Sequence, residues 1–171
     1  MGRILLVHGL IAGAVIAIVS FGGLALMAGD DGVAAGSQWL GYTVMVIALS
    51  VIYFAVKGYR DDQQGGVIRF RVALKLGLGI SLVAGAVYVL GWEIYFQATG
   101  GDFVQEYAAS YLAQMRADGA AVDAISAARE RMAEFEELYA FLPARIAITR
   151  VEILPVGVLI SLLSAALLRK P

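Results

Sequence analysis

The chain alternates long apolar runs with shorter polar segments. Residues 4–27, 38–56, 72–96 and 144–168 are almost continuous in apolar side chains. A helix needs about 20 apolar residues to cross a hydrocarbon core about 30 Å thick. The pattern therefore predicts an all-α polytopic membrane protein, a four-transmembrane-helix bundle in which residues 1–171 form one membrane domain.

The first run has a competing interpretation as a signal peptide, because Arg3 precedes it and small residues follow near Ala25. The apolar region of a signal peptide has about 7 to 15 residues, whereas this run extends from Ile4 to Met27. Its length favours a retained membrane helix.

Residues 99–141, between the third and fourth runs, have a different pattern. Acids, arginines and alanines are interspersed with apolar side chains at helical spacing, and Asp118-Gly119 interrupts the pattern. We expect a helical hairpin outside the cytoplasm whose two helices pack together or onto the membrane surface. The two apolar stripes are Phe103, Tyr107, Tyr111, Leu112 and Met115, and Val122, Ile125, Met132, Phe135 and Tyr139.

Composition supports a membrane protein and excludes several other classes. Hydrophobic residues make up 60% of the chain and charged residues only 16%, unlike soluble domains. The formal charge of −1 gives no electrostatic basis for binding nucleic acid. The absence of cysteine excludes disulfides and thiolate metal sites.

The cations predict the orientation. With four spans, Arg3, the basic hinge at residues 57–75 and the tail Arg169-Lys170 lie on one side. The positive-inside rule makes that side the cytoplasm, with both termini there and with Gly29-Asp30-Asp31-Gly32 and the hairpin outside. We therefore expect a multi-pass protein of the bacterial inner membrane.

The hinge itself combines cations with a turn. Gly65-Gly66 is typical of a turn ahead of the third helix. Arg60, Arg69 and Arg71 are candidates for contacts with anionic lipid headgroups. Membrane lipids are thus expected partners.

A polar group is expected where the third and fourth spans end on the outer side. At 1.5 Å per residue, Arg150 lies about 27 Å and Glu152 about 24 Å from Leu168, and Glu93 lies about 32 Å from Val72. An ion pair of Arg150 with Glu93 is expected, although Arg150 and Glu152 are about 200° apart around the helix. Structural pairing or snorkelling is favoured over a proton, ion or ligand site, and both interpretations stay open.

Small residues recur every fourth position in two spans. Such ridges allow close approach of another helix, either within the chain or in a second copy. They consist of Gly9, Gly13 and Ala17 in the first span, and Gly157, Ser161 and Ala165 in the fourth.

Two further residues stand out within the spans. His8 is the single histidine, so it cannot form a metal site alone, and we expect a polar helix contact or a titrating group. Pro155 is expected to bend the fourth helix.

The chain contains no metalloprotease helix motif, no P-loop and no nucleophile elbow. With one histidine and no cysteine, the usual nucleophile and base sets cannot be assembled. We expect a protein that is not an enzyme and needs no cofactor.

The basic hinge and the last span together resemble a known family. The residues are Lys57-Gly58-Tyr59-Arg60-Asp61, Gly65-Gly66, Ile68, Phe70, Ala73 and Gly77, then Pro155-Val156-Gly157 and Ile160-Ser161. They are similar to a bacterial family of four-span membrane proteins filed as a domain of unknown function, the four-one-nine-nine family. The resemblance implies an inner-membrane location and the four-helix plan, and it brings no activity or site residue.

The leading functional hypothesis is an accessory or interaction protein of the bacterial envelope. Its hairpin would contact another envelope protein or form a homo-oligomer. The alternative is a small transporter or lipid-handling protein that uses Glu93, Arg150, Glu152 and the bent fourth helix as a gate.

Overall fold

A computed structural model describes residues 1–27, 33–101 and 103–169. Within these ranges the side chains of 24–27, 33–40 and 103 are not described. The predicted loop at Gly29-Asp30-Asp31-Gly32 and the side chain of Phe103 therefore lie outside the described residues.

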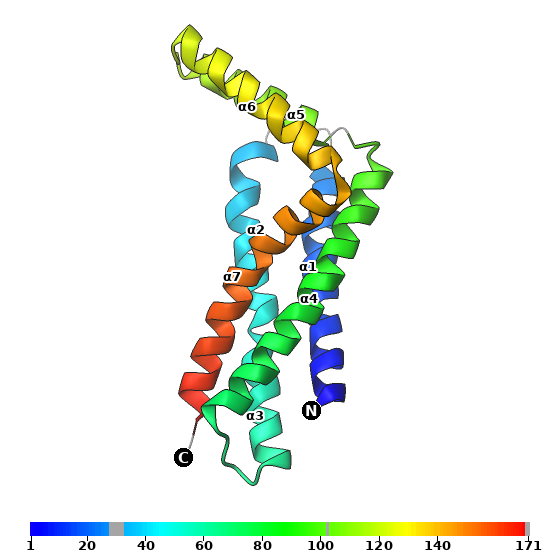
Figure 1. The fold of residues 1–171 in the computed structure, drawn as a ribbon, viewed down its shortest axis with the longest axis vertical. Coiled ribbons are helices and arrows are strands. Elements are labelled where there is room, and N and C mark those ends of the chain that lie inside the picture. Colours follow the sequence, from blue (N-terminus) through cyan, green and yellow to red (C-terminus); the bar gives the residue numbers. More distant parts are fainter. Residues whose placement is uncertain (28–32, 102, 170–171) are drawn as a thin grey trace.

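The described chain is helical almost throughout, and the predicted all-α class is confirmed (Figure 1). The helices are α1 (Gly2–Met27), α2 (Val33–Leu49), α3 (Val51–Gln63), α4 (Phe70–Ala98), α5 (Phe103–Ala117), α6 (Val122–Ala140) and α7 (Leu142–Leu168).

Four candidate membrane spans are long and apolar enough to cross a bilayer, as the sequence predicts. They are Gly2–Gly23, Gly41–Gln63, Phe70–Ala98 and Leu142–Leu168. The second span runs to Gln63 rather than residue 56, because the helix continues through the polar residues that follow the apolar run. It comprises α2 from Gly41 onward and α3, which are separated at Ser50, where the hydroxyl donates to the carbonyl of Val46 at 2.7 Å.

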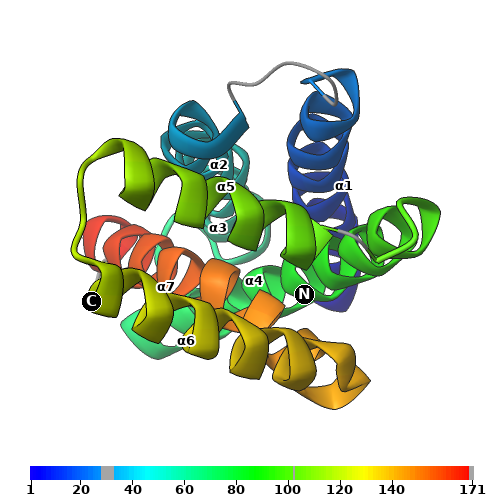
Figure 2. The ribbon, with the colours of Figure 1, turned by 90° about the horizontal axis from the view of Figure 1, so that it is seen from above.

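The most buried span is α4, which packs mainly against α1 and α7. Both chain ends lie at one end of the bundle, which we call the termini end, and α5 and α6 lie at the other, the hairpin end (Figure 1). Seen from above in Figure 2, α5 and α6 lie side by side across the helices of the bundle. The predicted hairpin between the third and fourth spans is thus present.

Glycines allow α1 and α4 to approach closely. A Cβ built on Gly13 would lie 2.6 Å from the Cβ of Val87 and 2.7 Å from the carbonyl oxygen of Ala84. A Cβ on Gly9 would lie 2.6 Å from the Cβ of Val83. The small-residue ridge of the first span therefore faces α4 of the same chain.

The contact between α4 and α7 repeats one small motif on both helices. A Cβ on Gly77 would lie 2.9 Å from the side chain of Ser161, and a Cβ on Gly157 would lie 2.7 Å from that of Ser81. The two serine hydroxyls lie 3.3 Å apart, and each also bonds to a carbonyl of its own helix. Glycine admits the neighbouring serine, and the serines satisfy each other's polarity inside the bundle.

Glycines lie at the two turns that the sequence predicts between these helices. Gly65 and Gly66, between α3 and α4, have φ of 63° and 84°, and Gly119, between α5 and α6, has φ of 73°. These left-handed values suit glycine, which has no Cβ to clash.

The predicted apolar stripe of α5 divides between two faces. Leu112 and, in α6, Ala128 are buried, and Val104 at the start of α5 is buried as part of the core cluster of the bundle. Tyr107 and Tyr111 are exposed. Each lies about 100° around the helix from the residue that follows it, the half-buried Ala108 or the buried Leu112. The tyrosines therefore form part of the hairpin's surface.

Candidate functional site

Arg145 is the most heavily bonded charged residue at the hairpin end. Its side chain is buried at 5% exposure, near the start of α7. Nε donates to Oε1 of Glu93 at 2.8 Å, and Nη2 donates to Oε2 of the same carboxylate at 2.9 Å. This bidentate geometry is the strongest form of an arginine–carboxylate pair.

Two further contacts complete what we call the Arg145 clamp: Arg145, Glu93, Tyr139 and Phe96. Nη1 donates to the backbone carbonyl of Tyr139 at 2.9 Å, and the guanidinium lies 4.3 Å from the centre of the Phe96 ring. That carbonyl belongs to the last turn of α6, where helix carbonyls lack partners in their own helix. One side chain therefore joins the end of α4, the end of α6 and the start of α7.

Aromatic rings surround the clamp and extend it to α1. The Tyr139 ring lies 5.9 Å from Phe96 and 6.4 Å from Trp92, and Phe21 of α1 stacks on Tyr88 at 5.2 Å. Edge-on and offset ring pairs at these separations contribute a favourable free energy beyond that of the apolar area that they bury. The hairpin base is thus packed on the aromatic rings of α4, which in turn contact α1.

The phenol of Tyr139 stays neutral in this packing. Burial raises its pKa above the ordinary value, and the neighbouring polar groups of Thr149 and Trp92 and the charge of Arg145 oppose the shift to a lesser extent. Tyr139 therefore acts as a hydrogen-bonding and packing group within the clamp.

Glu152 occupies a second polar position, about two helical turns along α7 from Arg145. Its Oε2 accepts a hydrogen bond from the Tyr88 hydroxyl at 3.0 Å, and the residue is otherwise exposed. The carboxylate therefore has a neutral partner on α4.

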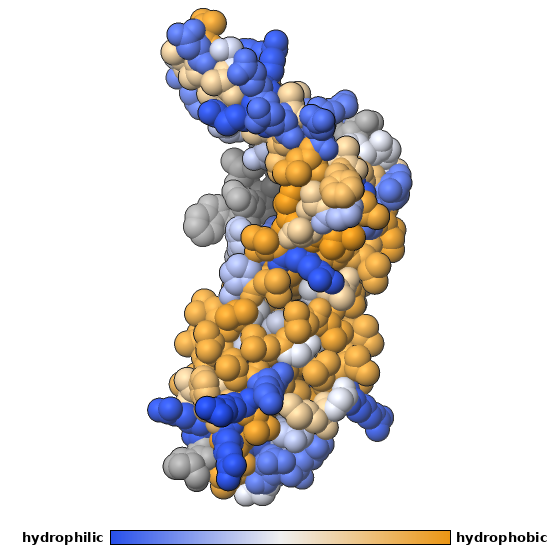
Figure 3. All heavy atoms as spheres, viewed as in Figure 1, coloured by the Kyte–Doolittle hydropathy of each residue, from blue (hydrophilic) through white to orange (hydrophobic). Residues whose placement is uncertain are grey.

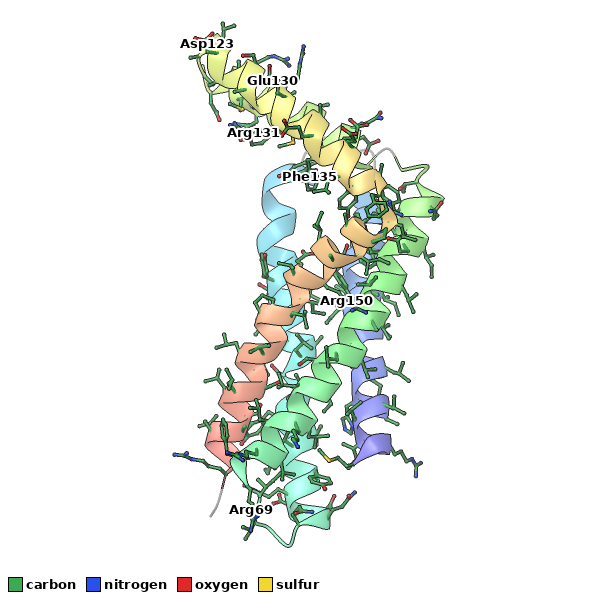
Figure 4. All side chains as sticks on the ribbon, viewed as in Figure 1. Arg69, Asp123, Glu130, Arg131, Phe135 and Arg150 are labelled. Carbon is green, nitrogen blue, oxygen red and sulfur yellow. The ribbon has the colours of Figure 1, made fainter. Side chains whose placement is uncertain are left out.

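The predicted ion pair between Arg150 and Glu93 is wrong. Glu93 is held by Arg145, and Arg150 is exposed on α7 and has no ion pair among the described residues (Figure 4). Arg145 is about 35 Å along the helix from Leu168, so it matches the level of Glu93 better than Arg150 does. Glu93, Arg150 and Glu152 consequently do not form one group.

The other predicted residues have local or packing contacts. Nδ1 of His8 lies 2.8 Å from the carbonyl oxygen of Ile4 in its own helix. Arg60 pairs with Asp61 at 2.7 Å, and Arg69 and Arg71 are exposed near the termini end. The helix α7 continues through Pro155 and changes direction along its length in Figure 1. Within the described residues, no group of three or more His, Cys, Asp or Glu side chains could hold a metal ion.

A comparison with protein families decides the relationship of the chain. The family model described as Protein of unknown function (DUF4199) matches residues 8–170. The chain belongs to this family. No curated protein and no solved structure matches it.

In this DUF4199 chain the match includes the whole of α4 to α7, so it contains every residue of the Arg145 clamp. The family resemblance drawn from the hinge and the last span is therefore correct. The sequence prediction does not include the clamp, because it pairs Glu93 with Arg150, another arginine of the same span. Arg145 lies about 35 Å along α7 from Leu168, and Glu93 lies about 32 Å along α4 from Val72. Since Leu168 and Val72 lie on the same side of the predicted bundle, this similar depth is the signal in the sequence that could have identified the pair.

Proposed function

We propose that this DUF4199 protein is a non-enzymatic integral protein of the bacterial inner membrane that docks another envelope protein on its hairpin. The observation that carries the proposal is the Arg145 clamp. A loop that merely connects two spans needs no buried bidentate ion pair, whereas a docking surface gains affinity when its geometry is set before binding.

The exposed surface of α5 supports a protein partner. The rings of Tyr107 and Tyr111 lie 6.5 Å apart with planes 11° from parallel, and the residues are 47% and 40% exposed. Tyrosine offers a large contact area with few rotatable bonds and is enriched at protein interfaces. We infer that this pair is the centre of the docking surface.

The distribution of cations supports the orientation. Figure 3 shows hydrophilic residues at both ends of the molecule, and Figure 4 places the hinge residue Arg69 at the termini end and the oppositely charged Glu130 and Arg131 at the hairpin end. By the positive-inside rule the termini end faces the cytoplasm and the hairpin lies outside the membrane. The proposed partner is therefore an envelope protein with a surface on that side.

Labelling of single cysteines tests the orientation, since the chain has no cysteine of its own. Ala133→Cys in α6 and Gln63→Cys at the end of α3 are both exposed positions. In intact spheroplasts, a membrane-impermeant maleimide should label Ala133→Cys at once and Gln63→Cys only after permeabilisation. The reverse order would refute the orientation.

Removal of the tyrosines tests the docking surface. A protein that copurifies with the wild type from crosslinked native membranes should be reduced at least about tenfold by Tyr107→Ser with Tyr111→Ser, since interface aromatics carry much of the binding energy. Glu130→Ser, an exposed change on α6, is the matched control and should leave the yield unchanged. Equal yields from all three proteins would argue against docking, and a crosslinked product containing only this chain would indicate a homo-oligomer.

The transporter or lipid-handling alternative ranks second. A carboxylate inside a candidate span, that of Glu152 with the neutral Tyr88 hydroxyl as its partner, is the observation that favours it. The proposed gate, however, required Glu93, Arg150 and Glu152 to act together, and the two carboxylates are bonded to different residues, Arg145 and Tyr88, with neither bonded to Arg150.

A further inference from the structure

Arg150 is a cation on the apolar surface of a candidate span. It lies within α7, next to Val151, which is 67% exposed, and Figure 4 places it on the bundle below the hairpin. At that height Figure 3 shows mainly apolar atoms on the same face. Arginine in such a position is costly in a bilayer unless an anion accompanies it.

The chain does not supply that anion from its described residues. Glu93 is occupied by both nitrogens of Arg145 that face it, and Glu152 is bonded to Tyr88 about 200° around α7 from Arg150. Asp61 and Asp62 lie at the termini end. The other described carboxylates belong to the hairpin, residues 103–140. A second copy would present Glu93 and Glu152 bonded in the same way, so neither offers a better partner.

The depth of Arg150 points to the phosphates of the lipid itself. The residue lies about 27 Å along α7 from Leu168, which precedes the basic end of the helix. A hydrocarbon core is about 30 Å thick and helices tilt by about 20° on average, so Arg150 comes within a few ångströms of the boundary on the hairpin side. An arginine there extends its charged group toward the headgroups and leaves its methylene stem in the apolar region.

We propose that Arg150 binds the phosphate of a phospholipid in the leaflet on the hairpin side. The planar guanidinium matches two phosphate oxygens, and the acyl chains lie against the apolar surface of the bundle. The site does not depend on the hairpin partner. It adds a specific lipid contact on the side opposite the basic hinge.

Native mass spectrometry of the full chain, purified in detergent with added phosphatidylglycerol, tests the proposal. The wild type should retain a bound phospholipid, and Arg150→Leu should weaken that binding about tenfold, as expected for loss of a charged hydrogen-bonded contact. Arg150→Lys should retain an intermediate affinity. Arg116→Leu, an exposed arginine of the hairpin, is the matched control and should bind as the wild type does.

Phosphate competition and photocrosslinking separate this site from its alternatives, and gel filtration checks that the variant is folded. Inorganic phosphate at millimolar concentration should not displace the phospholipid, since it lacks acyl chains; displacement would replace the lipid site by a simple anion site. Unchanged lipid retention in Arg150→Leu, or an equal loss in Arg116→Leu, would overturn the proposal. A photocrosslinker at position 150 that captures a protein helix instead of lipid would also overturn it. Elution of Arg150→Leu as the wild-type species on gel filtration would show that the variant is folded.

Discussion

Arg145→Leu should lower the free energy of unfolding by about 3 to 5 kcal/mol, the usual result of removing one partner from a buried ion pair. The substitution leaves the Glu93 carboxylate without its bidentate partner and the Tyr139 carbonyl without a donor. It also removes the cation from the Phe96 ring. Reversible unfolding in mixed micelles, followed by circular dichroism, measures the change.

The matched control is Arg116→Leu, the same change at an exposed arginine of the hairpin. Because Arg116 is exposed and has no ion pair among the described residues, its loss should change the unfolding free energy by less than about 1 kcal/mol. Adding Glu93→Gln to Arg145→Leu should recover part of the lost stability, since no buried charge then remains unpaired. Equal effects of the two leucine variants would show that the clamp does not stabilise the fold.

Gly13→Ala is expected to destabilise the bundle by about 1 to 3 kcal/mol, the range for overpacking a close contact. The added methyl would lie 2.7 Å from the carbonyl oxygen of Ala84 and 3.0 Å from its Cα, and backbone atoms of α4 cannot turn away. The two helices must separate along their contact to admit it. The same unfolding measurement reports the loss.

Gly22→Ala, in the same helix, is the control, because a Cβ there meets no atom within 4 Å. It should be neutral or stabilise the protein by up to about 1 kcal/mol through better helix propensity. If Gly13→Ala and Gly22→Ala lowered the free energy of unfolding equally, the cause would be the replacement of any glycine in α1 and not the close contact of α1 with α4.

The clamp and the proposed docking surface make separable contributions. Arg145→Leu should free the hairpin from α4 and thereby weaken docking together with stability. The tyrosine double variant changes only exposed side chains and should weaken docking alone. Agreement of both patterns would connect the rigid attachment of the hairpin to its use as a surface.

The sequence predicts the four candidate spans, the hairpin and the small-residue contacts because each depends on local pattern. Twenty apolar residues favour a membrane helix wherever its neighbours lie, and a glycine every fourth residue forms a ridge on any helix. The structure adds that Gly9 and Gly13 face α4 and that Gly157 and Ser161 face Gly77 and Ser81. Glycine spacing alone does not tell whether a ridge contacts a helix of the same chain or of a second copy. The structure shows that these contacts lie within the chain.

The partner of Glu93 was beyond the reach of local pattern. Arg145 and Arg150 are about 140° apart around α7, so the rotation of one helix against another decides which of them meets α4. That rotation follows from the packing of Gly77 and Gly157 and from the place where α6 ends. The sequence by itself determined the helices, their order and their family, because these depend on length and periodicity. Only the tertiary structure decided that Arg145 closes the clamp and that Arg150 faces outward, because side chains distant in the chain meet according to helix rotation and depth.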